Sequence, residues 1–154
     1  MATEASLSSA LIKGMLASGH YVYKASDRFT AGISDISGVS SDGRAIAVEV
    51  KLVSSWPKRG SSRALKRALS YQQLSFLEEV SNRGGSAWIA IGHPLMSGRG
   101  IAVQLFTVDG WKSASLLSFP EGQEFIGENV SADSLKNEMG RALEGSISKG
   151  FVWP

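Results

Sequence analysis

The pattern of apolar and polar positions predicts a helix and then a group of strands in the first third of the chain. Residues 4–18 carry apolar side chains at helical spacing before Gly19, which is a stop signal: Leu7, Ala10, Leu11, Met15 and Leu16. Residues 21–24, 33–39 and 45–53 have the length and apolar content of strands. The pair Asp42-Gly43 lies between the last two and favours a tight hairpin turn. The chain is therefore expected to open with a helix, a short strand and an antiparallel hairpin.

A second helix and further strands are predicted after a loop over residues 54–62. The helix covers residues 64–82, with a break near Ser70 left open, and its apolar stripe is formed by Leu74, Leu77 and Val80, with Phe76 beside it. The run SAWIAI at 86–91 is bounded by glycines and suits a buried strand, and 101–108 forms another. We expect a last helix over 132–146, and the apolar tail GFVWP is expected to pack back on the body.

This order of elements predicts an α/β fold built on one mixed sheet. A hairpin and a crossover helix both feed the same sheet, in the order helix, strand, strand, strand, helix, strand, strand. We expect a single domain over residues 1–154, with a core over about 4–92 and a C-terminal extension over about 98–154 whose pattern indicates no role.

Composition agrees with a globular protein and excludes several kinds of site. Apolar residues make up 43% of the chain and charged residues 19%. No apolar run approaches the roughly 20 residues that cross a bilayer, and the N-terminal residues do not resemble a signal peptide, so no membrane partner and a cytoplasmic location are expected. The absence of cysteine excludes disulfides, thiolate zinc sites and a cysteine nucleophile.

The distribution of charge along the chain is more informative about a binding partner than the net charge of +2. The stretch from Lys51 to Leu77 contains no acidic residue but contains six basic ones: Lys51, Lys58, Arg59, Arg63, Lys66 and Arg67. One basic region on a near-neutral protein is expected for a polyanion partner, and it is equally expected for an ordinary solvated loop and helix face. Trp56 beside this loop would either stack on a base or anchor the loop.

Three charged residues on neighbouring strands are the candidates for chemistry. Strand alternation places Glu49 and Lys51 on one face of the sheet, and a hairpin turning at Asp42-Gly43 brings Asp35 beside Glu49. Buried charges are costly, whereas hard cations such as Mg²⁺ bind one or two carboxylates together with waters and phosphate oxygens. A Glu-x-Lys pair alone is common as a salt bridge on exposed strands, so the larger pattern must support the prediction.

That larger pattern resembles the PD-(D/E)xK nuclease superfamily. The segments GISD and VEVK, about a dozen residues apart, match its core motif. The later segment LSYQQLSFLEEVSNRGGSAWIAI is similar to the family helix, where Leu-Ser precedes a glutamine, an aromatic follows that glutamine by three, and glycines precede a core strand. Within the superfamily the chain most resembles the small VRR-NUC type domains, often found in phages and related to the archaeal Holliday-junction resolvase fold. The proline that often precedes the first aspartate is Ser34 here.

The resemblance covers about residues 4–91 and implies a restriction-endonuclease-like core, a mixed β-sheet flanked by helices in the order α-β-β-β-α-β. It implies that Asp35 and Glu49 bind Mg²⁺ or Mn²⁺, with the Val50 carbonyl as a further ligand. Lys51 would be the catalytic lysine.

Two further roles implied by the resemblance leave alternatives open. Gln73 would orient water or the lysine, but its neighbour Gln72 lies only about 100° away around the helix, and one of the two faces the site. Glu4 would add an outer carboxylate that could bind a second metal. The alternative for Glu4 is a charge favoured by the dipole at a helix N-terminus.

The expected function is a metal-dependent DNA endonuclease of a bacterial or phage-infected cell that hydrolyses phosphodiester bonds in DNA recombination. By the resemblance it would be structure-selective, like a Holliday-junction resolvase. Phosphate contacts are expected from basic residues: Lys24, Arg28, Lys58, Arg59, Arg63, Lys66 and Arg67. A Holliday-junction resolvase makes paired cuts, so a homodimer is expected. The alternatives are a general DNA nickase or repair nuclease, and a non-catalytic nucleic-acid-binding subunit of a phage or restriction complex.

Overall fold

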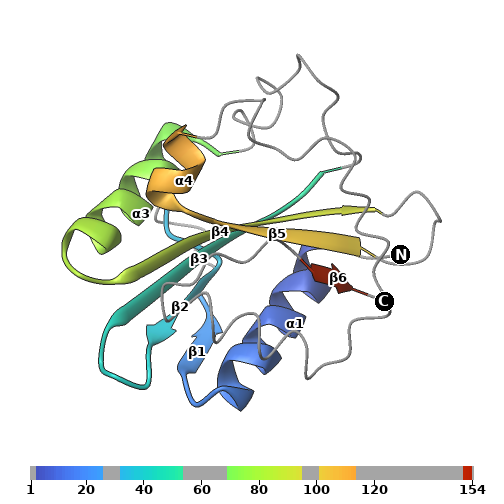
Figure 1. The fold of residues 1–154 in the computed structure, drawn as a ribbon, viewed down its shortest axis with the longest axis horizontal. Helices are drawn as coiled ribbons and strands as arrows, with labels where there is room; N and C mark the ends of the chain where they lie inside the picture. Colours follow the sequence, from blue (N-terminus) through green and yellow to red (C-terminus); the bar gives the residue numbers. More distant parts are fainter. Residues whose placement is uncertain (1–2, 26–31, 54–68, 95–100, 114–150, 154) are drawn as a thin grey trace.

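Six strands form one sheet, in sequence order, in the computed structural model, which describes residues 3–25, 32–53, 69–94, 101–113 and 151–153 (Figure 1). The strands are β1 (Tyr21–Lys24), β2 (Ile36–Val39), β3 (Ala45–Leu52), β4 (Ser86–Pro94), β5 (Ile101–Thr107) and β6 (Phe151–Trp153). Neighbouring strands are antiparallel except β3 and β4, which are parallel. A parallel pair needs a crossover connection, and helix α3 (Tyr71–Asn82) lies within it.

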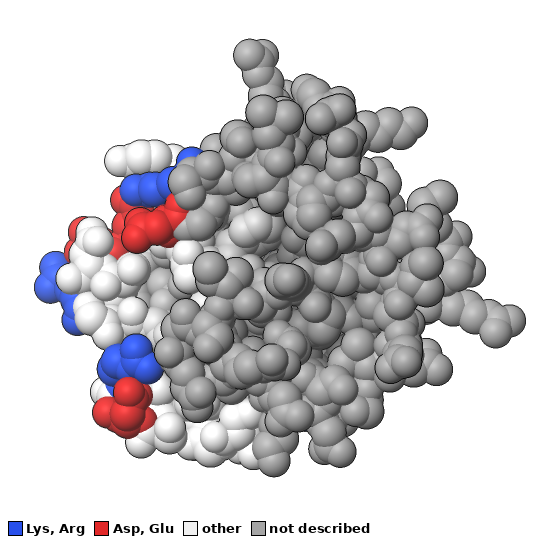
Figure 2. Space-filling view, viewed as in Figure 1, with Lys and Arg blue, Asp and Glu red and all other residues white. Residues whose placement is uncertain are grey.

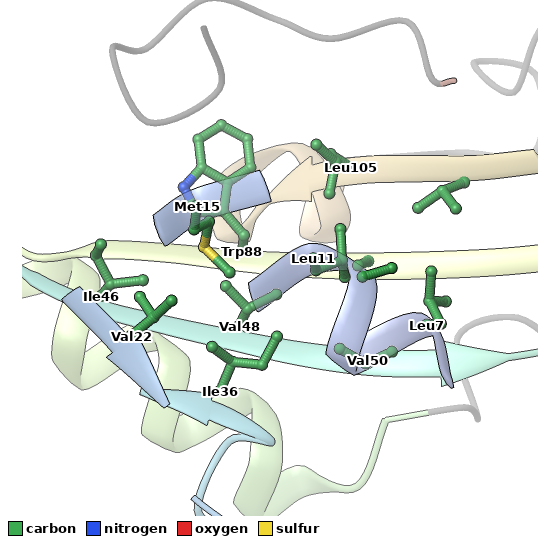
Figure 3. Close-up of a cluster of buried hydrophobic side chains, with 13 residues drawn as sticks. Leu7, Leu11, Met15, Val22, Ile36, Ile46, Val48, Val50, Trp88 and Leu105 are labelled. Carbon is green, nitrogen blue, oxygen red and sulfur yellow. The ribbon is translucent and has the colours of Figure 1, made fainter. Parts of the chain in front are cut away.

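Helices cover both faces of the sheet because the side chains of β3 alternate between two apolar layers. On one face, helix α1 (Glu4–Ala17) packs against β3 through Leu7, Leu11 and Met15, as Figure 3 shows. The β3 residues in this layer are Ile46, Val48 and Val50. The other face is covered by α3 and by helix α4 (Val108–Ser113). Because side chains alternate along β3, Glu49 lies on the same face as Ala47, which belongs to this second layer. The sheet therefore places a carboxylate under α3.

The predicted mixed α/β sheet and its order of elements are confirmed. Helix α1 ends at Ala17, within a residue of the prediction, and the expected stripe is buried except for Leu16, which is 47% exposed. Trp88 is buried, as expected for a core residue. The C-terminal extension adds β5 and β6 to the same sheet and α4 to one of its faces. The tail at residues 151–153 therefore does return to the body, as a strand paired with β5. Among the residues described, no helix is both long and apolar enough to cross a membrane.

Several predicted boundaries are wrong, each for a local reason. Strand β2 begins at Ile36 and not at Ile33, so Asp35 precedes the strand instead of lying within it. Helix α3 begins at Tyr71 and not at residue 64, because the Ser70 side chain caps it there and Leu69 and Ser70 are not helical. Helix α4 replaces the predicted end of a strand at Val108. Residues 64–68 and the helix predicted over 132–146 lie outside the described residues.

The close approach of β1 and β2 requires a glycine. Gly38 is opposite Val22, and a Cβ atom at Gly38 would lie 2.7 Å from the Val22 Cα atom and closer still to the Tyr21 carbonyl oxygen. These are backbone atoms and cannot move aside as a flexible side chain can. We predict that Gly38→Ala lowers the free energy of unfolding by about 1–3 kcal/mol, measured by urea denaturation. The exposed Val39→Thr variant on the same strand is the control, and equal effects of the two variants would contradict the prediction.

Candidate functional site

On one edge of β3, the pairing with β2 ends just before the predicted site residues Glu49 and Lys51. Strand β2 starts at Ile36, which pairs with Val48, so the next N–H groups on that edge of β3 lie beyond the β2 ladder. The Val50 N–H donates to Asp35 Oδ2 at 2.9 Å, and the Leu52 N–H donates to Glu4 Oε1 at 3.1 Å. Two carboxylates from distant parts of the chain thus take the place of β2 at this edge.

The backbone carbonyl of Val50 faces the same side as these carboxylates. In a strand the N–H and C=O groups of one residue point to the same neighbour. Because the Val50 N–H points to Asp35, the Val50 carbonyl oxygen points to the edge where Asp35 and Glu4 lie. Oxygen donors of this kind suit a hard divalent cation.

Glu49 lies on the adjoining face of β3, under the start of α3, and is 1% exposed. Its Oε1 atom accepts a hydrogen bond from Gln73 Nε2 at 2.9 Å and lies 3.4 Å from Lys51 Nζ. Its Oε2 atom is buried, and no donor in the described part of the chain reaches it. The Lys51 side chain is only partly exposed, so its ammonium group lies at the boundary between the buried carboxylate and solvent.

The surroundings of Glu49 favour its neutral form. Burial away from water raises the pKa of Glu49 to about 7, with the negative charge of Asp35 acting in the same direction and the Lys51 ammonium opposing both. When Glu49 is ionised, the Asp35 and Glu49 carboxylates place two negative charges beside the single positive charge of Lys51, which leaves an excess of negative charge. A bound cation would offset that excess and would also give Oε2 a partner.

The residues present therefore fit a divalent metal. Asp35, Glu49 and the Val50 carbonyl supply hard oxygen donors, and one carboxylate oxygen has no other partner among the described residues. Across the described ranges, no three His, Cys, Asp or Glu side chains converge as a metal cluster. Glu4 lies at the same edge as Asp35, because its carboxylate accepts a hydrogen bond from the Leu52 N–H group. Its role as a metal ligand stays a prediction.

Of the two glutamines, the structure brings Gln73 to Glu49. Gln73 is the third residue of α3, and its amide nitrogen donates to Glu49, whereas the Gln72 side chain is exposed. The role of Gln73 in catalysis stays a prediction.

The structure describes little of the predicted DNA-binding surface. Lys24 is the last residue of β1 and is exposed. It lies opposite Ile36, the residue that follows Asp35 in the sequence. The other basic candidates lie outside the described residues: Arg28, Lys58, Arg59, Arg63, Lys66 and Arg67, and so does Trp56. On the described part of the face in Figure 2, acidic and basic side chains are intermixed.

Two serines at the site were not predicted to contribute. Ser34 is buried, and its hydroxyl donates to the Ile36 carbonyl at 3.0 Å, which stabilises the bend that carries Asp35. Nothing in the sequence pattern around Ser34 predicts this bond. Ser70 caps α3 and accepts a hydrogen bond from the Gln73 N–H group. The Ser-x-x-Gln spacing is a capping signal, and it could have located both the start of the helix and the orientation of Gln73.

Comparison with known proteins adds little to this geometry. No protein-family model matches the chain, and no curated protein matches it. Among solved structures, it is similar to Hjc of Archaeoglobus fulgidus, described as a Holliday junction resolvase from an archaeal hyperthermophile. The TM-score is 0.48 at 18% identity, over 68% of this chain and 77% of that one. A likeness of this size assigns no function, and the mixed α/β fold rests on the strand order and pairing described above.

The raised pKa of Glu49 predicts a pH dependence of stability in the metal-free protein. The unfolded chain releases the Glu49 proton near the ordinary glutamate pKa of 4.5, whereas the folded protein retains the proton until about pH 7. The free energy of unfolding should therefore fall as the pH rises from about 4.5 to about 7, by on the order of 3 kcal/mol. Urea denaturation in EDTA across this range measures the fall.

Glu49→Gln keeps the size of the side chain and removes the titrating group, so this variant should lack that part of the pH dependence. Glu79→Gln, at an exposed position on α3, is the matched control for the loss of a carboxylate. If wild type and Glu49→Gln show the same dependence between pH 4.5 and 7, the buried carboxylate is not the cause.

Proposed function

We propose that this protein is a Mg²⁺- or Mn²⁺-dependent DNA endonuclease that hydrolyses phosphodiester bonds at the Asp35, Glu49, Lys51 and Gln73 site. The observation that carries the proposal is the buried Glu49 carboxylate. One of its oxygens is bonded to Gln73, and the other has no donor among the described residues, with Asp35 close by. On a sheet face that only bound a partner, a buried carboxyl group with one oxygen lacking a donor would destabilise the fold without serving the binding.

Each residue has a separate task in the proposed reaction. Asp35, Glu49 and the Val50 carbonyl would hold the metal. When bound, the metal would lower the pKa of water and polarise a phosphoryl oxygen. Water adds to phosphorus and loses a proton, the bond from phosphorus to one nucleoside oxygen breaks, and that oxygen takes up a proton.

Lys51 supplies the positive charge that this reaction needs at the substrate. Its ammonium group is close enough to Glu49 to be oriented by it and exposed enough to contact a phosphate. From there it offsets negative charge that develops on the phosphoryl oxygens, or holds the attacking water by a hydrogen bond. Gln73 holds the Glu49 carboxylate in place through its amide nitrogen.

We further propose that the substrate is branched DNA, with the four-way junction as the first candidate, and that the active form is a homodimer. The resemblance of the GISD, VEVK and LSYQQ segments to the junction-resolvase type of nuclease supports this substrate class. Two cuts placed symmetrically across a junction need two copies of the site, which a two-fold dimer supplies.

The metal-dependent cleavage is tested first. We expect purified protein to cut branched, flapped or linear DNA with Mn²⁺ or Mg²⁺, and EDTA to abolish cutting. Asp35→Asn, Glu49→Gln and Lys51→Ala should each lower the rate by roughly 10²-fold or more. Without DNA, calorimetric titration with Mn²⁺ should show much weaker binding for the two carboxylate variants than for Lys51→Ala, because the lysine is not a ligand.

Arg83→Ala is the control, because Arg83 forms an exposed ion pair with Glu79 at the opposite end of α3 from Gln73. If Lys51→Ala cuts as fast as wild type, the site is wrong. If no metal supports cutting and DNA binding is unchanged by EDTA, the protein is a non-catalytic nucleic-acid-binding module.

Substrate structure is tested by comparing the same sequence as a four-way junction, a flap, a nicked duplex and a linear duplex. We expect the junction to be cut at least roughly tenfold faster, at two symmetric positions, by a species that sediments as a dimer. A monomer that nicks all these duplexes at equal rates would instead indicate a general nickase or repair nuclease.

A further inference from the structure

Helix α3 begins at the candidate site through a reciprocal pair of hydrogen bonds. The Ser70 hydroxyl accepts from the Gln73 backbone N–H at 3.2 Å, and the Gln73 side-chain oxygen Oε1 accepts from the Ser70 backbone N–H at 2.9 Å. This is a capping box, which normally serves only to satisfy the free N–H groups at a helix start. Here the same glutamine side chain also reaches Glu49, with its amide nitrogen 2.9 Å from Glu49 Oε1.

A glutamine amide has a donor end and an acceptor end, and the two are not interchangeable at this position. The Ser70 N–H needs an acceptor, and only the oxygen of the Gln73 amide can accept it. A Glu49 carboxylate accepts, and only the amide nitrogen can donate to it. Rotating the amide by half a turn would break both bonds at once and place two oxygens together. The helix cap and the carboxylate therefore select the same orientation of Gln73.

We infer that Ser70 is a positioning residue of the site: its backbone N–H group holds the Gln73 oxygen, so that the Gln73 nitrogen is held against Glu49 Oε1 and Glu49 Oε2 is left for a ligand. This inference deepens the proposed function and rests on it for the identity of that ligand. Both donors to Glu49, from Gln73 and Lys51, lie at Oε1, while the buried Oε2 atom has no donor in the described residues.

The contributions of the Ser70 hydroxyl group and of the Ser70 backbone N–H group can be separated by substitution. Ser70→Ala removes the hydroxyl and keeps the N–H group. Ser70→Pro removes both, and proline fits because the φ angle of Ser70 is −73°, within the range that the ring allows. Ser70→Thr keeps both and should behave as wild type. The difference between the proline and alanine variants therefore measures the N–H group that holds the Gln73 oxygen.

A purely structural role of the cap needs its own control. Val80 is partly buried on α3, packs against the second apolar layer, and is separated from Gln73 by two helical turns. Val80→Ala should lower the melting temperature without touching the Gln73 amide, so it matches the capping variants for loss of stability alone.

The experiment uses the full chain without DNA and has two readouts besides the melting temperature. The first is the side-chain amide signal of Gln73 in ¹H–¹⁵N NMR spectra, assigned by its loss in Gln73→Met. The second is the Mn²⁺ dissociation constant from calorimetric titration. We expect Ser70→Thr and Val80→Ala to keep the wild-type values of both. We expect Ser70→Pro to move the amide signal toward the position of an exposed glutamine and to weaken Mn²⁺ binding by roughly tenfold or more, with Ser70→Ala between them.

The inference is overturned if Ser70→Pro keeps the wild-type amide signal, or if both readouts follow the melting temperature in every variant, Val80→Ala included. Its failure is distinguishable from failure of the proposed function. A wild-type protein that neither binds Mn²⁺ nor cuts DNA would refute the nuclease proposal. The amide signals of the threonine and proline variants would still decide whether Ser70 orients Gln73.

Discussion

Burial of the Glu49 carboxylate between β3 and α3 is the constraint around which the rest of the site is arranged. The alternation of β3 directs this side chain into an apolar layer, where an ionised group needs compensation from its neighbours. The compensation comes from three sources: the Gln73 amide, the Lys51 ammonium and, in the proposed function, a divalent cation beside Asp35. Gln73 lies on α3, Lys51 on β3 and Asp35 in the bend before β2. The packing of β2, β3 and α3 must therefore all be correct.

The parallel pairing of β3 and β4 explains why α3 starts where it does. The crossover leaves β3 at its C-terminal end, and α3 then runs back along the sheet toward the start of β4. Its N-terminus consequently lies over the end of β3 that carries Glu49 and Lys51, as the contact between Gln73 and Glu49 shows. A helix N-terminus is the positive end of the helix dipole, which suits a site rich in carboxylates.

The short length of β2 has an equally direct consequence for the edge of β3. If β2 continued to Ile33, as the apolar pattern predicts, its backbone would pair with Val50 and occupy the edge where the carboxylates lie. Instead the chain bends before Ile36, with Ser34 donating to the Ile36 carbonyl, and Asp35 reaches the Val50 N–H with its side chain. The loss of a few ladder hydrogen bonds thus leaves an edge lined with oxygen atoms.

The sequence by itself determined the order of the elements, the buried faces of the two long helices, and the shared face of Glu49 and Lys51. These follow from periodicity, because a residue's position in a helical or strand repeat fixes its side regardless of distant contacts. The Ser-x-x-Gln spacing also indicates the start of α3, although the apolar pattern alone predicts that the helix begins at residue 64. Only the tertiary structure decided that Asp35 lies outside its strand, that Gln73 rather than Gln72 meets Glu49, and that Glu4 reaches Leu52 across 48 positions of sequence. These depend on where a strand stops and how a helix is rotated over a sheet, and both are set by packing between segments that no local pattern encodes.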